Sequence, residues 1–506
     1  MTHIKLNDSL NIYYLLLYIM SHKVSLNKYK KLLHNKTRSH EKIKFGEVMT
    51  PLYVIICMIS MIPIKVWTNK NLKILDPASG DGRFSLYCYE MLMKKLKSIK
   101  NKTDRSNHII QNMLYMCEIN KQNVNKIISI FDSINSNIKP NIYDVDFLKW
   151  DTDIKFDIIV GNVPYNKSGG VGRVKGGSKQ PIWHRFIEKS LNILNNKGYI
   201  NFIHPVGWRK YYDKDENDNI GHVLYNYNQQ GSILSLKMNN IKYGDSWPIV
   251  DYYLYQKDVN KSSKIESIYN NKKYKSIVDL HTNKFIPSIY TLDVNNIINK
   301  LFINRKSDKL NIIYHAWMQP NKKMMGKSKN KNDISYAFYY DTKLNKYHVI
   351  YENTKSKITK SKSIKNKKRK IERLETSIKS PKIIMTFHGS KKIGHLHPQY
   401  FKEPIGTTTY TMYMDIKPSY NTTMLVNFLN SKLIIFLLIL TQYSPPPRNK
   451  NEWKILNNIH IPIGLNTHAT DDSIYKYYNL TKNEVQLIEE VINNAFIKRR
   501  KRTQKK

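Results

Sequence analysis

Residues 72–84 read Leu-Lys-Ile-Leu-Asp-Pro-Ala-Ser-Gly-Asp-Gly-Arg-Phe, and this stretch decides the fold class. An apolar strand runs into an Asp-Pro turn with two glycines, Gly80 and Gly82, and an apolar helical segment follows from Phe84. Glycines leave no Cβ between the turn and a bound ligand, and the helix amino terminus offers unpaired N–H groups. A dinucleotide fingerprint requires a third glycine where Ser85 stands. A nicotinamide or flavin cofactor is therefore disfavoured.

Apolar strands alternate with helical segments from residue 43 to about residue 257. Residues 156–160 and 199–203 have the composition of buried strands, and residues 184–194 have helical periodicity. This alternation predicts an α/β fold with a parallel sheet. The alternation fades after residue 257, so we expect a second, mixed α/β domain, in which residues 422–440 have the length and composition of one buried helix.

The composition points to an anionic partner. Lys and Arg number 83 against 39 acidic residues, a formal net charge of +44, which makes nucleic acid the expected partner. The three cysteines lack Cys-x-x-Cys spacing, so we expect neither a disulfide scaffold nor a metal site. The longest apolar runs, residues 13–20 and 433–440, are far shorter than the roughly 20 residues that cross a bilayer. The sequence therefore predicts no membrane segment.

The predicted strand at residues 156–160 is followed by Gly161-Asn162-Val163-Pro164-Tyr165, at the sheet edge where α/β folds place their ligands. An exocyclic amine such as adenine N6 is a poor nucleophile, because its lone pair is delocalised into the ring. An enzyme that alkylates it needs acceptors for its N–H groups rather than a base. The side-chain oxygen of Asn162 and the carbonyl of Val163 meet this requirement, with positioning as the main catalytic contribution.

Residues 76–82 resemble motif I of S-adenosylmethionine-dependent adenine methyltransferases, and residues 45–51 resemble motif X of the same family. The resemblance implies S-adenosylmethionine as the cofactor and no metal. It implies that Glu118 accepts hydrogen bonds from the ribose hydroxyls, that Asp146 accepts from the adenine amino group, and that Phe147 covers the adenine ring. The full set of implied cofactor-binding residues is Glu47, Thr50, Pro51, Asp76, Ala78, Gly80, Gly82, Glu118, Asp146 and Phe147.

Asn162, Val163, Pro164 and Tyr165 are similar to the Asn-Pro-Pro-Tyr motif of this family. The resemblance implies that the asparagine and the next carbonyl hold N6 and that Tyr165 stacks on the flipped base. The chain departs from the family at Val163, which supplies a carbonyl but lacks the fixed φ of proline. Cytosine C5 methylation would need a nucleophilic cysteine beside a proline, and no cysteine of the chain has that setting.

The carboxyl-terminal half resembles a target-recognition domain. Residues 425–432 are similar to the Leu-Asn-Ser helix of such domains, and residues 459–463 to their Ile-Pro-x-Pro segment. A base inside a duplex must be flipped to reach the catalytic loop, so a second domain has to hold the DNA. The basic residues 166–181 suit either a flap over the phosphate backbone or an insertion without a ligand, and Arg448 follows a stiff triple-proline turn.

These observations predict four segments. They are an N-terminal helical segment (1–42), a catalytic domain with a Rossmann-like seven-stranded methyltransferase sheet (43–260), a target-recognition domain with a basic insertion at 355–370 (261–465), and a C-terminal helix with a basic tail (466–506). The predicted function is site-specific adenine-N6 methylation of double-stranded DNA through base flipping, either alone or as the modification component of a restriction-modification system.

Several alternatives stay open at this point. The acceptor could instead be RNA or a protein glutamine, or the chain could be a catalytically decayed DNA-binding protein. The sequence leaves a separate restriction endonuclease and the oligomeric state undecided. No secretory cleavage site follows the apolar run at residues 13–20, so we expect an intracellular protein located in the cytoplasm or wherever its DNA resides.

Overall fold

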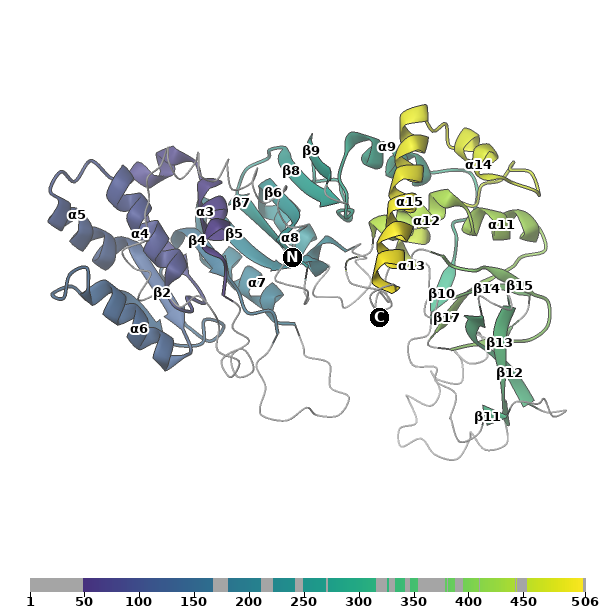
Figure 1. Ribbon diagram of the computed structural model, residues 1–506, viewed down its shortest axis with the longest axis horizontal. Helices are drawn as coiled ribbons and strands as arrows, with labels where there is room; N and C mark the ends of the chain where they lie inside the picture. Colours follow the sequence, from purple (N-terminus) through teal and green to yellow (C-terminus); the bar gives the residue numbers. More distant parts are fainter. Residues whose placement is uncertain are drawn as a thin grey trace. The chain divides into compact units, whose positions relative to one another are not determined.

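The computed structural model describes residues 49–166, 181–210, 222–241, 249–269, 272–314, 325–326, 333–341, 346–353, 378–379, 381–386, 395–408, 410–441, 443 and 453–503. The chain forms two units, Met1–Ile286 and Pro287–Lys506 (Figure 1). Several predicted features lie outside the described residues, namely Glu47, the segment 1–42, most of the flap 166–181, the insertion 355–370 and Arg448.

The first unit is built on a nine-stranded sheet with the order β3-β2-β1-β4-β5-β7-β6-β8-β9. Strand β7 is antiparallel to β5 and β6, and β9 is antiparallel to β8, whereas the other neighbours are parallel. The strands are β1 Ile74–Asp76, β2 Leu114–Glu118, β3 Asn141–Asp144, β4 Phe156–Asn162, β5 Leu194–Pro205, β6 Gly231–Ile241, β7 Val250–Lys257, β8 Ser263–Tyr269 and β9 Lys272–Val278.

The mainly parallel α/β sheet confirms the predicted fold class, with two differences. Seven strands, from β3 to β6, make up the predicted sheet, and β8 and β9 extend it at the β6 edge. The predicted domain boundary near residue 260 therefore differs from the observed division after Ile286. The reason is that the parallel pairing of β8 with β6, for example Leu236 with Ile265, joins residues 263–278 to the first sheet.

The strand order reverses between β1 and β4. From β1 the chain moves outward to β2 and β3, then returns to β4 and moves outward again to β5. Loops that leave the carboxyl ends of two such strands diverge and open a crevice, which is where open α/β sheets bind ligands. Right-handed crossovers place the helices between β1, β2 and β3 on one face of the sheet and the helix between β4 and β5 on the other.

Several helices of the first unit bury an apolar face. In α6, the residues Val124, Ile127, Ile130 and Phe131 recur at helical spacing and are buried. Asn120 caps this helix, because its side chain accepts a hydrogen bond from the backbone N–H of Gln122. The helices and helical turns are α3 Leu52–Ser60, η2 Ile64–Thr68, α4 Arg83–Lys95, α5 Lys102–His108, η3 Ile109–Met113, α6 Lys121–Asp132, α7 Trp183–Ile193, η4 Val206–Arg209 and α8 His222–Gln230.

The second unit contains two four-stranded sheets and several helices. One sheet has the order β10 Ile312–Tyr314, β17 Thr411–Asp415, β14 Lys382–Thr386 and β15 Gln399–Phe401. The other has the order β11 Met325–Gly326, β13 Lys346–Asn353, β12 Asp333–Asp341 and β16 Gly406–Thr407. The described helices are α9 Leu292–Leu301, α11 Thr422–Leu429, α12 Lys432–Leu440, α13 Trp453–Leu456, α14 Asp471–Tyr477 and α15 Lys482–Thr503.

The prediction of one helix over residues 422–440 is wrong. Helices α11 and α12 are separate and bent by 45° at their junction. Asn430 ends α11, and the Ser431 side chain caps α12 by accepting from the Ile434 N–H, so the Leu-Asn-Ser sequence itself makes the break. Among the described residues no single helix is long and apolar enough to cross a membrane, and only this bent pair meets that test jointly. Residues 433–440 of the pair are buried inside the second unit.

A buried ion pair joins η4 to β7 beside the sheet. The Nε atom of Arg209 lies 2.8 Å from an oxygen of Asp251, and both side chains are at most 1% exposed. The indole N–H of Trp208 donates to the same carboxylate. Nearby, His204 stacks on Trp183, and burial lowers the pKa of His204 to about 3. The imidazole is therefore neutral, as a structural residue requires.

We expect the Arg209→Met substitution to lower the free energy of unfolding by about 3–5 kcal/mol, because it leaves the buried Asp251 carboxylate without its cation. Urea unfolding checks this expectation. The double substitution Arg209→Met with Asp251→Leu removes both charges and should recover most of the loss. A double variant as unstable as the single one would show that packing, not the unpaired charge, sets the cost.

Candidate active site

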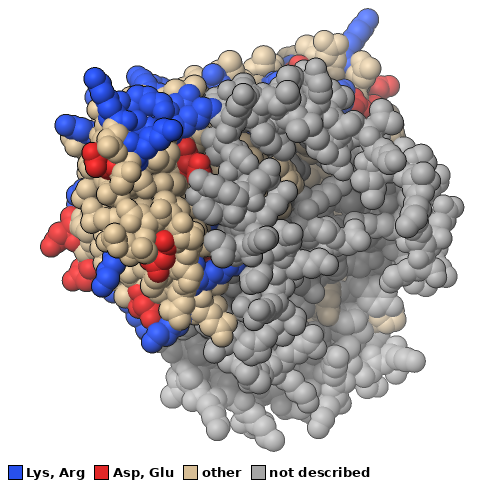
Figure 2. Space-filling view, turned by 60° about the vertical axis from the view of Figure 1, so that its left-hand side comes forward, with Lys and Arg blue, Asp and Glu red and all other residues tan. Residues whose placement is uncertain are grey.

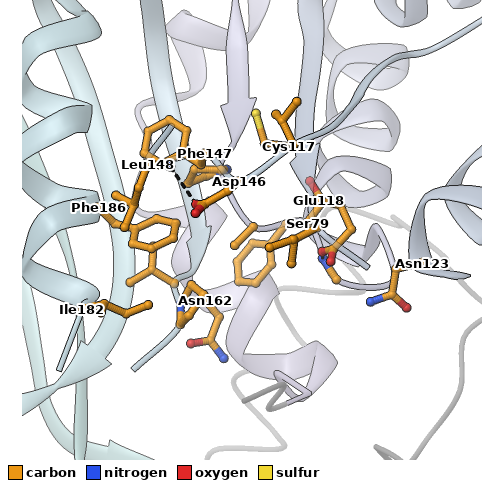
Figure 3. Close-up of a pocket in the computed structure, with 18 of the residues that line it drawn as sticks. Ser79, Cys117, Glu118, Asn123, Asp146, Phe147, Leu148, Asn162, Ile182 and Phe186 are labelled. Carbon is orange, nitrogen blue, oxygen red and sulfur yellow. Dashed lines mark hydrogen bonds between the residues drawn. The ribbon is translucent and has the colours of Figure 1, made fainter. Parts of the chain in front are cut away.

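The loops that follow β1, β2, β3 and β4 enclose a pocket of about 390 Å³ (Figure 3). A cavity of this size is in the usual range for small-molecule sites. It lies at the switch point of the sheet, between the ends of β1 and β4. Among the predicted site residues, those that line it are Thr50, Ala78, Gly80, Glu118, Asp146, Phe147, Asn162, Val163, Pro164 and Tyr165.

Three of the predicted cofactor residues do not line the pocket but lie in the segments that shape it. Pro51 precedes α3, and Asp76 is buried at the end of β1, where its Oδ1 accepts from the Ala78 N–H. Gly82 begins α4 with φ of 81°, and a Cβ there would lie 2.8 Å from Cγ1 of Ile127. Glycine at this position therefore satisfies both the left-handed backbone and the close approach of α6.

The loop that carries Gly80 and Gly82, called the glycine loop below, is hydrogen-bonded to the end of β2. The backbone N–H of Ser79 donates to the Cys117 carbonyl at 3.0 Å, and that of Gly80 donates to a carboxylate oxygen of Glu118 at 2.6 Å. The other oxygen of Glu118 accepts from the Asn120 N–H at 2.7 Å. A carboxylate has about four lone-pair sites, so a single carboxylate can accept hydrogen bonds from several donors at once.

An aromatic wall closes the pocket on the side of the β3–β4 connection. Phe147 is buried and stacks on Phe186 of α7 with ring centroids 5.4 Å apart. The ammonium group of Lys189 lies 5.3 Å from the centroid of the Phe147 ring. Asp146 also lines the pocket, and its Oδ1 accepts from the Leu148 N–H, as Figure 3 shows. This side of the pocket suits a flat ring that carries a hydrogen-bond donor.

The end of β4 brings Asn162 into the same pocket. Its neighbour Gly161 packs against β1 so closely that a Cβ would lie 2.9 Å from Oδ1 of Asp76. Pairing with Ile203 of β5 fixes the Asn162 backbone, and its Nδ2 donates to the Thr50 hydroxyl at 3.0 Å. Tyr165 is buried and also lines the pocket. The pocket therefore combines acceptor groups at Asn162 and Val163 with the glycine loop and Glu118.

Several lining residues were not predicted. Arg83 donates to both oxygens of Asp81 at 2.7 and 2.6 Å and to the Thr50 carbonyl at 2.9 Å. Arg83 follows the second glycine directly, but no sequence pattern pairs it with residue 50. Phe186 lies on the apolar face of α7 that the helical periodicity predicted, so its place against the sheet could have been found. The other unpredicted lining residues include Asn123 of α6, Ile182 and Arg185.

Cys117 lines the pocket but is not an activated nucleophile. Burial raises the pKa of its thiol, and the neighbouring carboxylates Asp76 and Glu118 raise it further. A thiol in this setting stays protonated at neutral pH, whereas nucleophilic cysteines have a lowered pKa. The pocket therefore suits chemistry in which the chain supplies acceptors and positioning. Among the described residues, no group of three or more His, Cys, Asp or Glu side chains could hold a metal ion.

Residues 82–241 match the family model described as Eco57I restriction-modification methylase. The matched segment contains Glu118, Asp146 and the Asn162–Tyr165 loop, and it covers less than half of the chain. The resemblance to restriction-modification methyltransferases that the motifs indicated is thereby confirmed for this segment. A comparison with curated proteins found no match.

Solved structures of restriction-modification enzymes resemble the chain at low sequence identity. The ATP-dependent type ISP enzyme LlaBIII, bound to DNA, has a TM-score of 0.50 at 13% identity, with 81% of this chain and 38% of that chain covered. The type IIL enzyme MmeI, in complex with DNA, has a TM-score of 0.48 at 10% identity, with 91% and 80% covered. This chain thus spans well under half of LlaBIII, and at such identity the likeness shows the fold alone.

We expect Asp76 to make stability depend on pH. Burial raises the pKa of its carboxyl well above the ordinary value, and the charges of Glu118 and Asp81 add to the shift. A raised pKa means that the native state favours the protonated form of Asp76. The contribution of Asp76 to stability is therefore fully present below the ordinary pKa of a carboxyl group, and it is lost as pH rises through the pKa of the folded state. Asp76→Asn removes this penalty, and its thermal midpoint should gain on the wild type as pH rises from mildly acidic to neutral.

Thermal unfolding of both proteins across that pH range measures the difference. Asp153→Asn is the matched control, since it removes one negative charge at an exposed position of the same unit. A constant difference between Asp76→Asn and wild type would contradict the expectation.

Proposed function

We propose that this chain is an S-adenosylmethionine-dependent DNA methyltransferase that methylates N6 of adenine in duplex DNA. One observation carries the proposal: Asn162, at the end of β4, lines the same pocket as Gly80, Glu118 and Phe147. The proposed binding site for the methyl donor and the proposed binding site for the substrate amine thus share one cavity at the switch point of the sheet. The family match over residues 82–241 supports methylase chemistry for this segment.

The residues present fit the proposed cofactor. The Glu118 carboxylate would accept hydrogen bonds from the two ribose hydroxyls, and Phe147 would cover the adenine ring, with Asp146 as an acceptor for its amino group. Gly80 lets the backbone approach the ligand without a side chain. When bound, S-adenosylmethionine supplies an electrophilic methyl group on its sulfonium. Ala78, in the same loop as Gly80, also lines the pocket and completes the proposed cofactor-binding residues there.

The loop at the end of β4 would orient the substrate amine, adenine N6. Oδ1 of Asn162 and the main-chain carbonyl of Val163 accept the two N–H groups of adenine N6, which favours a pyramidal nitrogen with its lone pair turned toward the methyl donor. Pro164 keeps the loop extended, and Tyr165 stacks on the base. Positioned hydrogen bonds of this kind contribute mainly to the transition state. No base is required before the transfer, since the proton leaves after the nitrogen gains its positive charge.

A duplex partner is favoured by charge and by access. The net charge of +44 is suited to a polyanion, and Figure 2 shows Lys and Arg side chains gathered on part of the described surface. A paired adenine cannot enter a pocket at the edge of a sheet, so the base has to be flipped out of the duplex. We assign the holding and reading of the duplex to residues 287–465, the part of the predicted target-recognition domain (261–465) that belongs to the second unit.

We further propose that the chain is the modification component of a restriction-modification system. The matched family is described in those terms, and the enzymes LlaBIII and MmeI, whose structures are described with DNA, belong to such systems. In this context a separate endonuclease would cleave the unmodified sequence. The methyl group that this chain adds would protect the host DNA.

We expect Asn162→Ala to keep S-adenosylmethionine affinity and to lower methyl transfer by about 100-fold or more, the size of loss when one positioned transition-state hydrogen bond is removed. Calorimetric titration measures the affinity. Transfer of labelled methyl to unmodified plasmid DNA, followed by nucleoside analysis, measures the rate and identifies the base. Asn192→Ala, at an exposed position of α7, is the control for loss of an asparagine side chain.

The same assay separates the alternatives. Label on cytosine would overturn the assignment of adenine, and label on RNA or on protein glutamine with none on DNA would identify another acceptor. A wild-type chain that binds DNA and S-adenosylmethionine but transfers no methyl would be a decayed DNA-binding protein. Unchanged turnover in Asn162→Ala would remove Asn162 from the mechanism.

A further inference from the structure

We infer that Thr50 is a positioning residue for Asn162, a role different from the cofactor contact that the motif resemblance implied. The inference rests on the proposed function and concerns how Asn162 is held. Thr50 is 2% exposed, and its hydroxyl accepts a hydrogen bond from Nδ2 of Asn162 at 3.0 Å. The two residues are far apart in the sequence but adjacent on the pocket wall.

The chemistry of an amide explains why such a partner is needed. A side-chain amide has a donor end and an acceptor end, and an amine that offers N–H groups must meet the acceptor end. The amide keeps this orientation when its donor end is bound to an acceptor elsewhere. A threonine hydroxyl has two acceptor lone pairs, and Thr50 places one of them at Nδ2. A hydroxyl can pair with either end of an amide, and here it pairs with Nδ2. In this arrangement the bond holds the amide in place, and Oδ1 is the end that the proposed chemistry uses.

Thr50 is itself held in place by the glycine-loop side of the pocket. Nη1 of Arg83 donates to the Thr50 carbonyl at 2.9 Å, and the Arg83 guanidinium makes a bidentate pair with Asp81. Lys126 of α6 lies 3.6 Å from the same Asp81 carboxylate. On the carboxyl-terminal side of Thr50, the Pro51 carbonyl accepts a hydrogen bond from the Val54 N–H in the first turn of α3. The Thr50 backbone is therefore fixed from both sides before its hydroxyl meets Asn162.

The arrangement links the two halves of the pocket. Asp81 and Arg83 belong to the loop and helix that carry Gly80 and Gly82, whereas Asn162 belongs to β4. Thr50 bridges them, because its backbone is bound to Arg83 and its side chain to Asn162. The acceptor that the reaction requires is thus aligned by the same chain segment that borders the proposed cofactor site.

The test compares Thr50→Val, which removes the hydroxyl and keeps a branched side chain, with Thr50→Ser, which keeps the hydroxyl. We expect Thr50→Val to lower the single-turnover rate of methyl transfer by about 10- to 100-fold, the range typical of a misplaced reacting group. Its affinity for S-adenosylmethionine should stay within about twofold of wild type. Thr50→Ser should restore most of the rate. Loss of affinity in proportion to the rate, or full activity in Thr50→Val, would overturn the inference.

A second measurement is independent of activity. Urea unfolding of Thr50→Val, Asn162→Ala and the double variant forms a double-mutant cycle. If the hydroxyl and the amide act on each other, the double variant should unfold at nearly the midpoint of the less stable single variant. Additive shifts would overturn the inference. Ser190→Ala is the control, since Ser190 is buried and its hydroxyl has no hydrogen-bond partner within the described part of the chain. Combined with Asn162→Ala, it should give additive shifts.

Failure of the proposed function and failure of the inference about Thr50 give different results. A wild-type chain that transfers no methyl to DNA, RNA or protein would end the proposed function, while the unfolding cycle would still report whether Thr50 holds Asn162. An active wild type with additive unfolding shifts would keep the proposed function and reject the role of Thr50.

Discussion

The close approach of β4 to β1 is the constraint on which the site depends. Gly161 has no room for a side chain, because a Cβ would meet Oδ1 of Asp76 at 2.9 Å. This contact brings the last residue of β4 next to the loop that follows β1. Asn162 can then line the pocket that Gly80 and Glu118 also line. A larger residue at position 161 would separate the two strand ends and, with them, Asn162 from the loop that carries Gly80.

Packing alone does not orient the groups that the proposed chemistry needs. The glycine loop is held by backbone donors to the end of β2, including the Gly80 N–H to Glu118. The amide of Asn162 is held by Thr50, whose carbonyl is bound by Arg83. These bonds are internal to the first unit, so the geometry is present before any ligand binds. Such preorganisation is where enzymes gain most of their electrostatic catalysis.

Local patterns predicted many of the strands and helices, the glycine turn and the catalytic loop, because strand composition, glycine turns and strand-end polar residues are local signals. Asn162 was predicted in this way, whereas Glu118 was predicted from the motif resemblance. The Thr50–Asn162 and Arg83–Thr50 bonds were not, since they join segments that become neighbours only through the strand order. The break between α11 and α12 was missed because an apolar run from Leu433 hides the capping signal of Ser431. The predicted boundary near residue 260 separated strands β8 and β9 from the first sheet, since neither strand has a continuous apolar run.

The function follows from the site rather than from the fold. Doubly wound α/β sheets serve many reactions, and low-identity likeness to restriction-modification enzymes does not choose among them. The choice comes from what the pocket contains. The raised pKa of Cys117 argues against its use as a thiolate, and His204 is hydrogen-bonded to Tyr253. What the pocket offers an amine is a set of fixed acceptors beside a glycine loop. That combination supports the proposed alkylation of a weakly nucleophilic nitrogen.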